Sequence, residues 1–390
     1  MAVMRTRRGT ILAKIESTEG VDAAPAAGDA ILAENLRLTF DPGLVTTNEM
    51  TGSLDPEAPI VGGLKASVTF DVYLKGSGSA GTAPEFGPLF KACGWQEVVT
   101  GAAIGAPTTA SAGTTGTVTL GTSATTTAQA YRGMPIVLSG NPATPAATFI
   151  TNYTSGKVAT LARNFSPALT TATLWQIPAN VLYRPTSDDS LIKSVSMYFY
   201  MDGVLVKMLG SRGTFVITHV AGQPAKIAFT FTGMYGGKTD AAVVAGTFDA
   251  TRPPIWRDPN GDASGHFSIG KVEAALRQFV FTNGNQNVYP DNPNEAEGFQ
   301  PTVIASRRMT GSMDPLATLV ATRNLMDDFR NGTQRLVHSR IGTVAGNRIG
   351  LTIPLAHPEN YTPGDREGLA TEEVPFFCAG KDAGAFMCFW

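Results

Sequence analysis

One short stretch of the chain has the spacing of a nucleotide-binding turn. The segment GSGSAG at residues 76–81 fits GxGxxG, in which glycines let the backbone approach a pyrophosphate at the start of a helix. A dinucleotide site also needs a buried parallel strand before the turn and an acidic residue after it for the ribose. Here the preceding strand alternates polar and apolar residues, and no acidic residue occurs between Glu97 and Asp188. We therefore expect a flexible Gly/Ser loop.

A second stretch, DPNGDASG at residues 258–265, resembles the start of a calcium-binding loop, because Asp258, Asn260 and Asp262 alternate. An EF-hand loop needs Gly at its sixth position and Glu at its twelfth, where this chain has Ala263 and Ile269. A polar turn fits these residues better, although a weak surface calcium site stays open.

The other reactive residues form no recognisable constellation. The four histidines lack HExxH spacing, no GxSxG elbow accompanies them, and the three cysteines form no CxxC pair. We expect the cysteines to be buried free thiols and the pair Glu372 and Glu373 to be a solvated edge. The sequence therefore predicts no enzyme, no cofactor and no metal site. The histidines are His219, His266, His338 and His357, and the cysteines are Cys93, Cys378 and Cys388.

Charge also restricts the function. The net charge of −2 argues against a surface that neutralises nucleic-acid phosphates, which requires a strongly basic face. Four cations and no acidic residue lie between Glu97 and Asp188, which leaves −6 for the rest of the chain. A basic-neutral segment is thus set inside an acidic protein. Its cations are Arg132, Lys157, Arg163 and Arg184.

The elements that would position any site are mostly strands. Period-2 alternation predicts strands over 64–74, 195–209 and 225–232, with a hairpin turn at Asp202-Gly203. Only two segments look helical, Pro84 to Cys93 and Ala321 to Asn331, and each is followed by a Gly suited to a left-handed cap.

A short motif occurs twice, as MTGSLDPEAP at 50–59 and MTGSMDPLAT at 309–318. When the acid-free stretch is set aside, residues 10–97 with 188–237 and residues 246–390 give two units of similar length and similar order of features. We interpret them as a diverged duplication, although the strand at 64–74 has no clear partner between Pro315 and the second helix.

The motif residues favour a rigid turn. Asp-Pro holds the aspartate extended and begins a turn, Gly permits unusual backbone angles, and Thr and Ser hydroxyls can bond to their own backbone. Two such turns at matching positions suggest quasi-equivalent contacts in a symmetric assembly. The residues expected to make subunit or ring contacts are Met50, Thr51, Gly52, Ser53, Asp55 and Pro56 in the first copy and Met309, Thr310, Gly311, Ser312, Asp314 and Pro315 in the second.

The acid-free stretch itself has short alternating runs, broken by Gly, Asn and Pro, at the spacing of a small sandwich or barrel. The runs begin at residues 114, 131, 147, 157 and 171. A Thr/Ala/Ser-rich linker is the alternative to a folded inserted domain.

Several segments in the same order resemble the major tail tube proteins of long-tailed, non-contractile (siphovirus-like) bacteriophages. They are residues 13–40, MTGSLDPEAP, residues 76–95, 194–215, 221–235, 343–354 and 363–376. The resemblance implies a mainly β fold with two tandem tail-tube-type β-sandwich or barrel domains, each with a flanking helix, plus an inserted small Ig-like β domain. We expect an N-terminal arm over 1–30, a first tube domain over 31–99 and 184–245, the inserted domain over 100–183, and a second tube domain over 246–390.

The resemblance further implies a structural virion protein whose sheets join around a ring, with rings stacked into a conduit for DNA. Three duplicated chains would make a pseudo-hexameric homotrimer, with the inserted domain outside and the N-terminal arm against the adjacent ring. Implied partners are the tail tip and tail terminator proteins, the tape measure protein, and double-stranded DNA that slides past an acidic lumen without specific binding; no membrane is involved. Assembly would occur in the host bacterial cytoplasm and the product would be the virion tail.

The alternative from another class is a carbohydrate-binding or adhesin β-sandwich protein that uses the insertion for recognition. It should have an aromatic-rich groove, yet most aromatic residues of the insertion occupy core-like positions. They are Tyr131, Phe149, Tyr153, Phe165, Trp175 and Tyr183.

Overall fold

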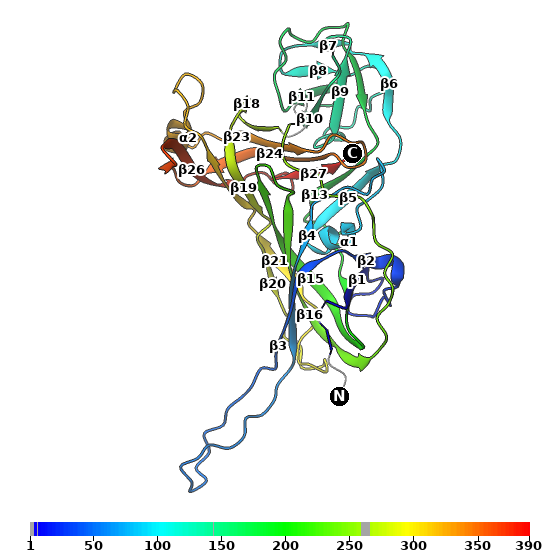
Figure 1. Cartoon of the computed structure of the whole chain (residues 1–390), viewed down its shortest axis with the longest axis vertical. Coiled ribbons are helices and arrows are strands. Elements are labelled where there is room, and N and C mark those ends of the chain that lie inside the picture. Colours follow the sequence, from blue (N-terminus) through cyan, green and yellow to red (C-terminus); the bar gives the residue numbers. More distant parts are fainter. Residues whose placement is uncertain (1–3, 6, 143, 259–265) are drawn as a thin grey trace.

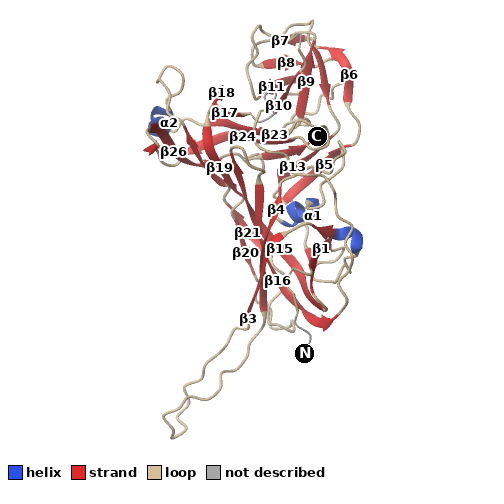
Figure 2. Ribbon diagram, in the orientation of Figure 1, coloured by secondary structure: helices blue, strands red, loops and turns tan. Residues whose placement is uncertain are grey.

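The computed structural model describes residues 4–5, 7–142, 144–258 and 266–390, and it is mainly β, with two short α-helices in this part of the chain (Figures 1 and 2). This confirms the β-rich class and the rarity of helices expected from the sequence. Most strands belong to one large, bent sheet system, and a separate seven-stranded sheet lies above it in Figure 1.

We call the part of the large sheet system within residues 9–240 the first half. Its helix is α1 (Gly87–Ala92), and a short 3-10 turn covers Ala27–Asp29. Its strands are β1 (Gly9–Ile15), β2 (Ala30–Ile31), β3 (Glu34–Asp41), β4 (Lys65–Tyr73), β5 (Trp95–Thr100), β13 (Asn180–Pro185), β14 (Val195–Met201), β15 (Val204–Val220) and β16 (Lys226–Asp240).

Residues 266–390 form the second half, with helix α2 (Leu325–Asn331). Its strands are β17 (Phe267–Ile269), β18 (Val272–Glu273), β19 (Leu276–Thr282), β20 (Asn285–Val288), β21 (Val303–Arg307), β22 (Thr310–Pro315), β23 (Arg335–Ile341), β24 (Ile349–Pro358), β25 (Thr362–Arg366), β26 (Leu369–Cys378) and β27 (Phe386–Phe389).

The separate sheet has the order β6-β12-β9-β10-β11-β8-β7. Its strands are β6 (Ile104–Thr109), β7 (Ala112–Gly113), β8 (Thr117–Thr119), β9 (Pro135–Ser139), β10 (Ala146–Tyr153), β11 (Val158–Leu161) and β12 (Leu174–Ile177). The strands expected in the acid-free stretch are therefore present. Their core also receives one face of β27, through Phe386, Cys388 and Trp390.

The local predictions for the strongest elements are confirmed. The turn at Asp202-Gly203 has positive φ at both residues, 40° and 105°, as a tight hairpin requires. Both helices end at a left-handed Gly, with φ of 77° at Gly94 and 64° at Gly332. Each helix begins later than predicted, because non-helical turns at residues 85–86 and 321–322 come before its first helical residue.

Several strand pairings of the first half recur in the second half at a constant offset. Val45 faces Ile60 in an isolated bridge, and Val288 faces Val303 in β20 and β21, so both pairs are related by 243 residues. The pairs Thr39–Ser67 and Thr282–Thr310 have the same offset. We call residues related in this way counterparts.

This register differs from the one that the MTGS motifs suggest, since Met50 and Met309 are 259 residues apart. The counterpart of β4 is therefore β22, which ends at Pro315 instead of following it. The strand over 64–74 seemed to lack a partner only because the motif aligned the two halves in the wrong register.

Residues 1–30 are only partly an arm. Gly9–Ile15 pairs along its whole length with β14, and Ile11, Leu12 and Ala13 are buried. The expectation that this segment lies against an adjacent ring needs correction for β1, because its apolar residues already complete the core of their own chain.

Candidate assembly surfaces

Seven strands from both halves form one continuous antiparallel surface in the order β3-β4-β16-β15-β19-β22-β26. Within this surface the halves join where Val216–Val220 of β15 pairs with Gln278–Thr282 of β19; elsewhere β13 also pairs with β27. One face of these strands lies in the core, where Phe70, Phe229 and Phe215 are directly opposite one another on three neighbouring strands. Burial of this face fixes the register, because a one-residue slip would turn it to solvent.

The opposite face carries hydroxyl side chains together with charges of both signs. Thr69 pairs with Thr230, and Thr230 pairs with Thr214, so threonines line up across three strands. The hydroxyl residues of this face, none of them buried, are Thr39, Ser67, Thr69, Thr214, Thr218, Thr230, Thr232, Thr282, Thr310 and Ser312. Its basic residues include Arg37, Lys65 and Lys226; Lys65 lies opposite Asp41, and Lys226 is paired with Glu34 at 2.9 Å. Because acidic residues accompany these cations, such a face offers hydrogen bonds without the excess of positive charge that retains nucleic acid.

The two ends of this surface are unpaired within the described part of the chain. At one end β3 pairs only with β4; at the other, β25 extends the surface beyond β26 as an eighth strand and pairs only with β26. Open edges present unpaired backbone N–H and C=O groups, which favour pairing with another strand. The chain thus carries two complementary antiparallel edges.

The first motif copy lies in a loop over residues 42–64 that projects from the end of β3, shown in blue at the bottom of Figure 1. Thr51 Oγ1 accepts from Ser53 N–H at 3.3 Å, and Ser53 Oγ accepts from Asp55 N–H at 3.1 Å. These bonds confirm the turn predicted from the motif, with φ of 79° at Gly52. Asp55-Pro56 follows in the same exposed stretch.

The second motif copy is not a turn, and the prediction of the same corner twice is wrong. Thr310–Pro315 is strand β22, paired on both sides, and Met309, Met313 and Pro315 are buried. The Asp314 carboxylate accepts from two backbone N–H groups of β19 and pairs with Arg366 at 2.7 Å. Thr310 and Ser312 point to the hydroxyl face and Gly311 to the core.

The counterpart of the projecting loop is the hairpin over residues 285–307, built on β20 and β21, and it is docked on the first half. Asn285 donates to the carbonyls of Cys93 and Gly213, both at 2.8 Å. Arg307 donates to the Gly94 carbonyl at 2.8 Å, and the Tyr289 hydroxyl donates to Ala66 at 3.0 Å. One hairpin is therefore docked and the other is exposed.

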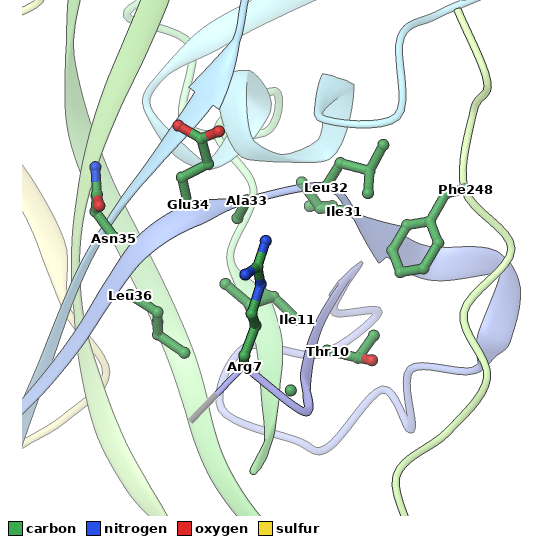
Figure 3. Close-up of a pocket in the computed structure, with 11 residues that line it drawn as sticks. Arg7, Thr10, Ile11, Ile31, Leu32, Ala33, Glu34, Asn35, Leu36 and Phe248 are labelled. Carbon is green, nitrogen blue, oxygen red and sulfur yellow. The ribbon is translucent and has the colours of Figure 1, made fainter. Parts of the chain in front are cut away.

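A groove of about 570 Å³ lies beside β3, with Ile11 inside it and Phe248 across from it (Figure 3). Its charged residues are Arg7 and Glu34. Thr10 and Asn35 add polar groups beside its apolar residues. The groove therefore has a mixed lining, without a recognisable catalytic arrangement.

The histidines are structural. His219 is buried between Trp256 and Phe279, and burial lowers its pKa from 6.5 to about 4. Burial also lowers the pKa of His338, whose Nδ1 lies 2.9 Å from the Thr352 hydroxyl. Burial lowers the pKa of His266 as well, beside Glu273 at 3.3 Å. These imidazoles are neutral near pH 7, and the hydroxyls that His338 and His219 contact, those of Thr352 and Ser339, are buried with them.

The three cysteines are buried free thiols, as expected, and burial raises the pKa of each. A protonated, enclosed thiol is a poor nucleophile and a poor metal ligand. Within the described ranges no group of three potential metal-binding side chains occurs. The candidate calcium loop lies outside the described residues except for Asp258.

Two further sequence interpretations are settled by packing. Glu372 is not a solvated edge, because it is buried and paired with Arg323 at 3.2 Å, whereas Glu373 is exposed. The GSGSAG loop is held by the second half instead of being flexible: Gly76 N–H donates to Asn347 at 2.8 Å and Gly78 N–H to Gly346 at 3.1 Å. The aromatic residues expected in the core of the insertion, from Tyr131 to Tyr183, are all buried.

The paired sheet, its open edges and its large hydroxyl face define an assembling structural protein more readily than an enzyme. The chain belongs to a family of phage tail proteins: the family model described as "Phage tail tube protein" matches residues 6–376. No curated protein matches the chain. Membership confirms the resemblance and makes this a structural, self-assembling component of a virion tail. Among the described residues no helix is long and apolar enough to cross a membrane.

Proposed function

We propose that three copies of this chain close into a pseudo-six-fold ring and that rings stack into the tube through which phage DNA is ejected. The observation that carries the proposal is the β15–β19 join, which makes one continuous surface from two halves and leaves β3 and β25 open at its ends. If β25 of one copy pairs with β3 of the next in the manner of the internal join, three chains complete the ring.

The internal join also gives a register for the join between chains. Val216 faces Thr282, whose counterpart is Thr39. Val216 lies opposite Ala228 in the first half, and Thr362 lies opposite Glu373 in the second. Thr362 therefore takes the position in the second half that Val216 takes in the first. In the proposed ring, Thr39 of one copy therefore lies opposite Thr362 of the next.

Stacking would use the projecting loop. Met50 and Leu54 at its tip are fully exposed, at 103% and 105%, which in a lone chain leaves two large apolar side chains in water. The loop extends beyond the rest of the body (Figure 1), so its tip can reach an adjacent ring. We assign the inter-ring contact to Met50, Thr51, Gly52, Ser53, Asp55 and Pro56, whereas the residues 309–315 stay within their own sheet.

The hydroxyl face would line the lumen. A wall of threonines and serines lets DNA and the tape measure protein pass, because a basic wall would exchange counterions for phosphates and hold the DNA. The separate sheet of residues 104–177, on the far side of β27, would decorate the outside. We further propose a long-tailed, non-contractile phage, assembly in the host cytoplasm, and tail tip and terminator proteins at the two ends of the tube.

Negative-stain microscopy of concentrated purified protein tests this function. Three-fold rings or tubes are the expected result. A protein that stays monomeric at high concentration and binds glycans would overturn it and favour the adhesin alternative, for which the buried aromatic residues of the insertion provide no groove.

A further inference from the structure

The ends of the two helices differ sharply in exposure. Cys93 and Gly94, which follow α1, are buried, whereas Asn331 at the end of α2 and Gly332 after it are exposed. Both glycines have the same left-handed cap conformation. The local structure is therefore the same, and only the covering differs.

The end of α1 is enclosed by the docked hairpin of residues 285–307. Asn285 and Arg307 donate to the carbonyls of Cys93 and Gly94, each at 2.8 Å. The Ile304 side chain packs directly against Gly94, and a Cβ on that glycine would lie 3.2 Å from Ile304 Cδ1. Polar bonds and an apolar contact together close this helix end.

The counterpart hairpin, residues 42–64, has the same length and three of the same apolar positions, and these three are exposed, whereas Gly63 and Leu64 contact the docked hairpin of their own chain at Glu297. Val45, Ile60 and Val61 are 55%, 60% and 67% exposed, and their counterparts in the docked hairpin are half-buried. Those counterparts are Val288, Val303 and Ile304. In each chain, the base of the hairpin at residues 42–64 therefore covers no helix end, and the end of α2 is covered by no hairpin.

We propose that the base of the projecting loop, residues 42–45 and 60–62, covers the end of α2 in a second copy of the chain in the same ring. This inference rests on the proposed function and assigns a second contact to each junction. It divides the loop into a base that seals its own ring and a tip that reaches the next ring. Both partners are present in every copy, so the contact repeats around a closed ring.

Chemical crosslinking tests the contact. Val61→Cys and Asn331→Cys place thiols on two exposed positions, while the three native cysteines are buried and do not react with a maleimide. Treating assembled V61C/N331C protein with a short bismaleimide should give covalent dimers and trimers and nothing larger, because a contact within a three-chain ring closes on itself. The matched control, L54C/N331C, moves one thiol to the loop tip and should remain mostly uncrosslinked within rings.

The outcomes separate the two proposals. Rings or tubes that form without V61C/N331C crosslinks overturn the loop-base contact and leave the ring intact as a proposal. A covalent ladder that extends beyond trimers also overturns it, because the contact would then join different rings. Absence of any ring or tube overturns both proposals.

Discussion

The two halves of the molecule share one design but differ in how completely the chain covers them. Helix α1 buries Leu89 and Phe90 and is enclosed at its end, whereas α2 buries Leu325 and leaves Met326 48% exposed. The difference arises because the first half is followed by another half whose hairpin docks on it, and the second half is not. The second half has no following half to cover it, so its exposed surfaces indicate where another copy of the chain would bind.

The largest expected effect on the free energy of unfolding comes from a substitution in the core of the first half. Phe90 is fully buried and lies within 5.0–6.5 Å of the rings of Phe215, Tyr183, Phe229 and three others. Phe90→Ala should lower the free energy of unfolding by about 3–5 kcal/mol. By contrast, Met326→Ala, at an exposed position of α2, should alter it by less than about 0.5 kcal/mol. Urea unfolding measures both, and equal effects would remove the contrast between the halves.

Acid should weaken the join between the halves. His219 in β15 has a folded pKa of about 4 against an ordinary 6.5, so the unfolded chain binds a proton more readily. Stability is therefore complete above pH 6.5 and falls by about 3 kcal/mol as the pH drops to 4. The buried His338 and His266 act in the same direction. His219→Phe should flatten this dependence, measured as unfolding free energy against pH; an unchanged slope would contradict the burial of a neutral imidazole.

The loop tip should matter for stacking alone. Met50→Ser with Leu54→Ser should leave the unfolding free energy within about 0.5 kcal/mol, because both side chains are fully exposed. Each apolar side chain buried in a contact contributes about 1.5–3 kcal/mol, so tube formation should need at least about 10-fold more protein. Sedimentation of tubes measures this. Val99→Ser, at a 53% exposed position in β5, is the control, and tubes unaffected by the tip change would exclude the tip from stacking.

The smallest effect concerns the register of the open edges. Like charges directly opposite each other destabilise the pairing of two strands, by about 0.2–1 kcal/mol per pair. Thr39→Glu with Thr362→Glu should therefore weaken ring closure by about 2- to 5-fold at each junction. Thr39→Glu with Thr362→Lys should restore it. Light scattering during assembly compares the two, and identical curves would show that these residues do not face each other.

Local signals made the strands, the Asp202-Gly203 turn and the helix caps predictable. A residue's own backbone angles and its alternation with neighbours determine these features, and both can be seen in a short window. The join of β15 to β19 could not be predicted in this way. It pairs residues that are 58 to 66 positions apart, such as Val216 with Thr282, and the sequence of neither strand indicates which strand it pairs with.

The prediction of a second turn from the MTGS motif was wrong for a related reason. Thr, Gly, Ser and Asp can form a turn when exposed, as at Ser53, or a strand when neighbours supply ladder bonds on both sides, as at Ser312. Glu372 illustrates the same limit, because the buried partner that neutralises it, Arg323, lies in a distant loop. Tertiary surroundings decided both cases.

The β15–β19 join also changes how the proposed ring would depend on protein concentration. In a ring of six separate domains all six joins form between molecules, and the yield rises with the sixth power of the free subunit concentration. Covalent linkage makes three of those joins before any encounter, so the dependence falls to the third power. A tenfold dilution in a newly infected cell, when subunits are scarce, then lowers ring formation about a thousandfold instead of about a millionfold.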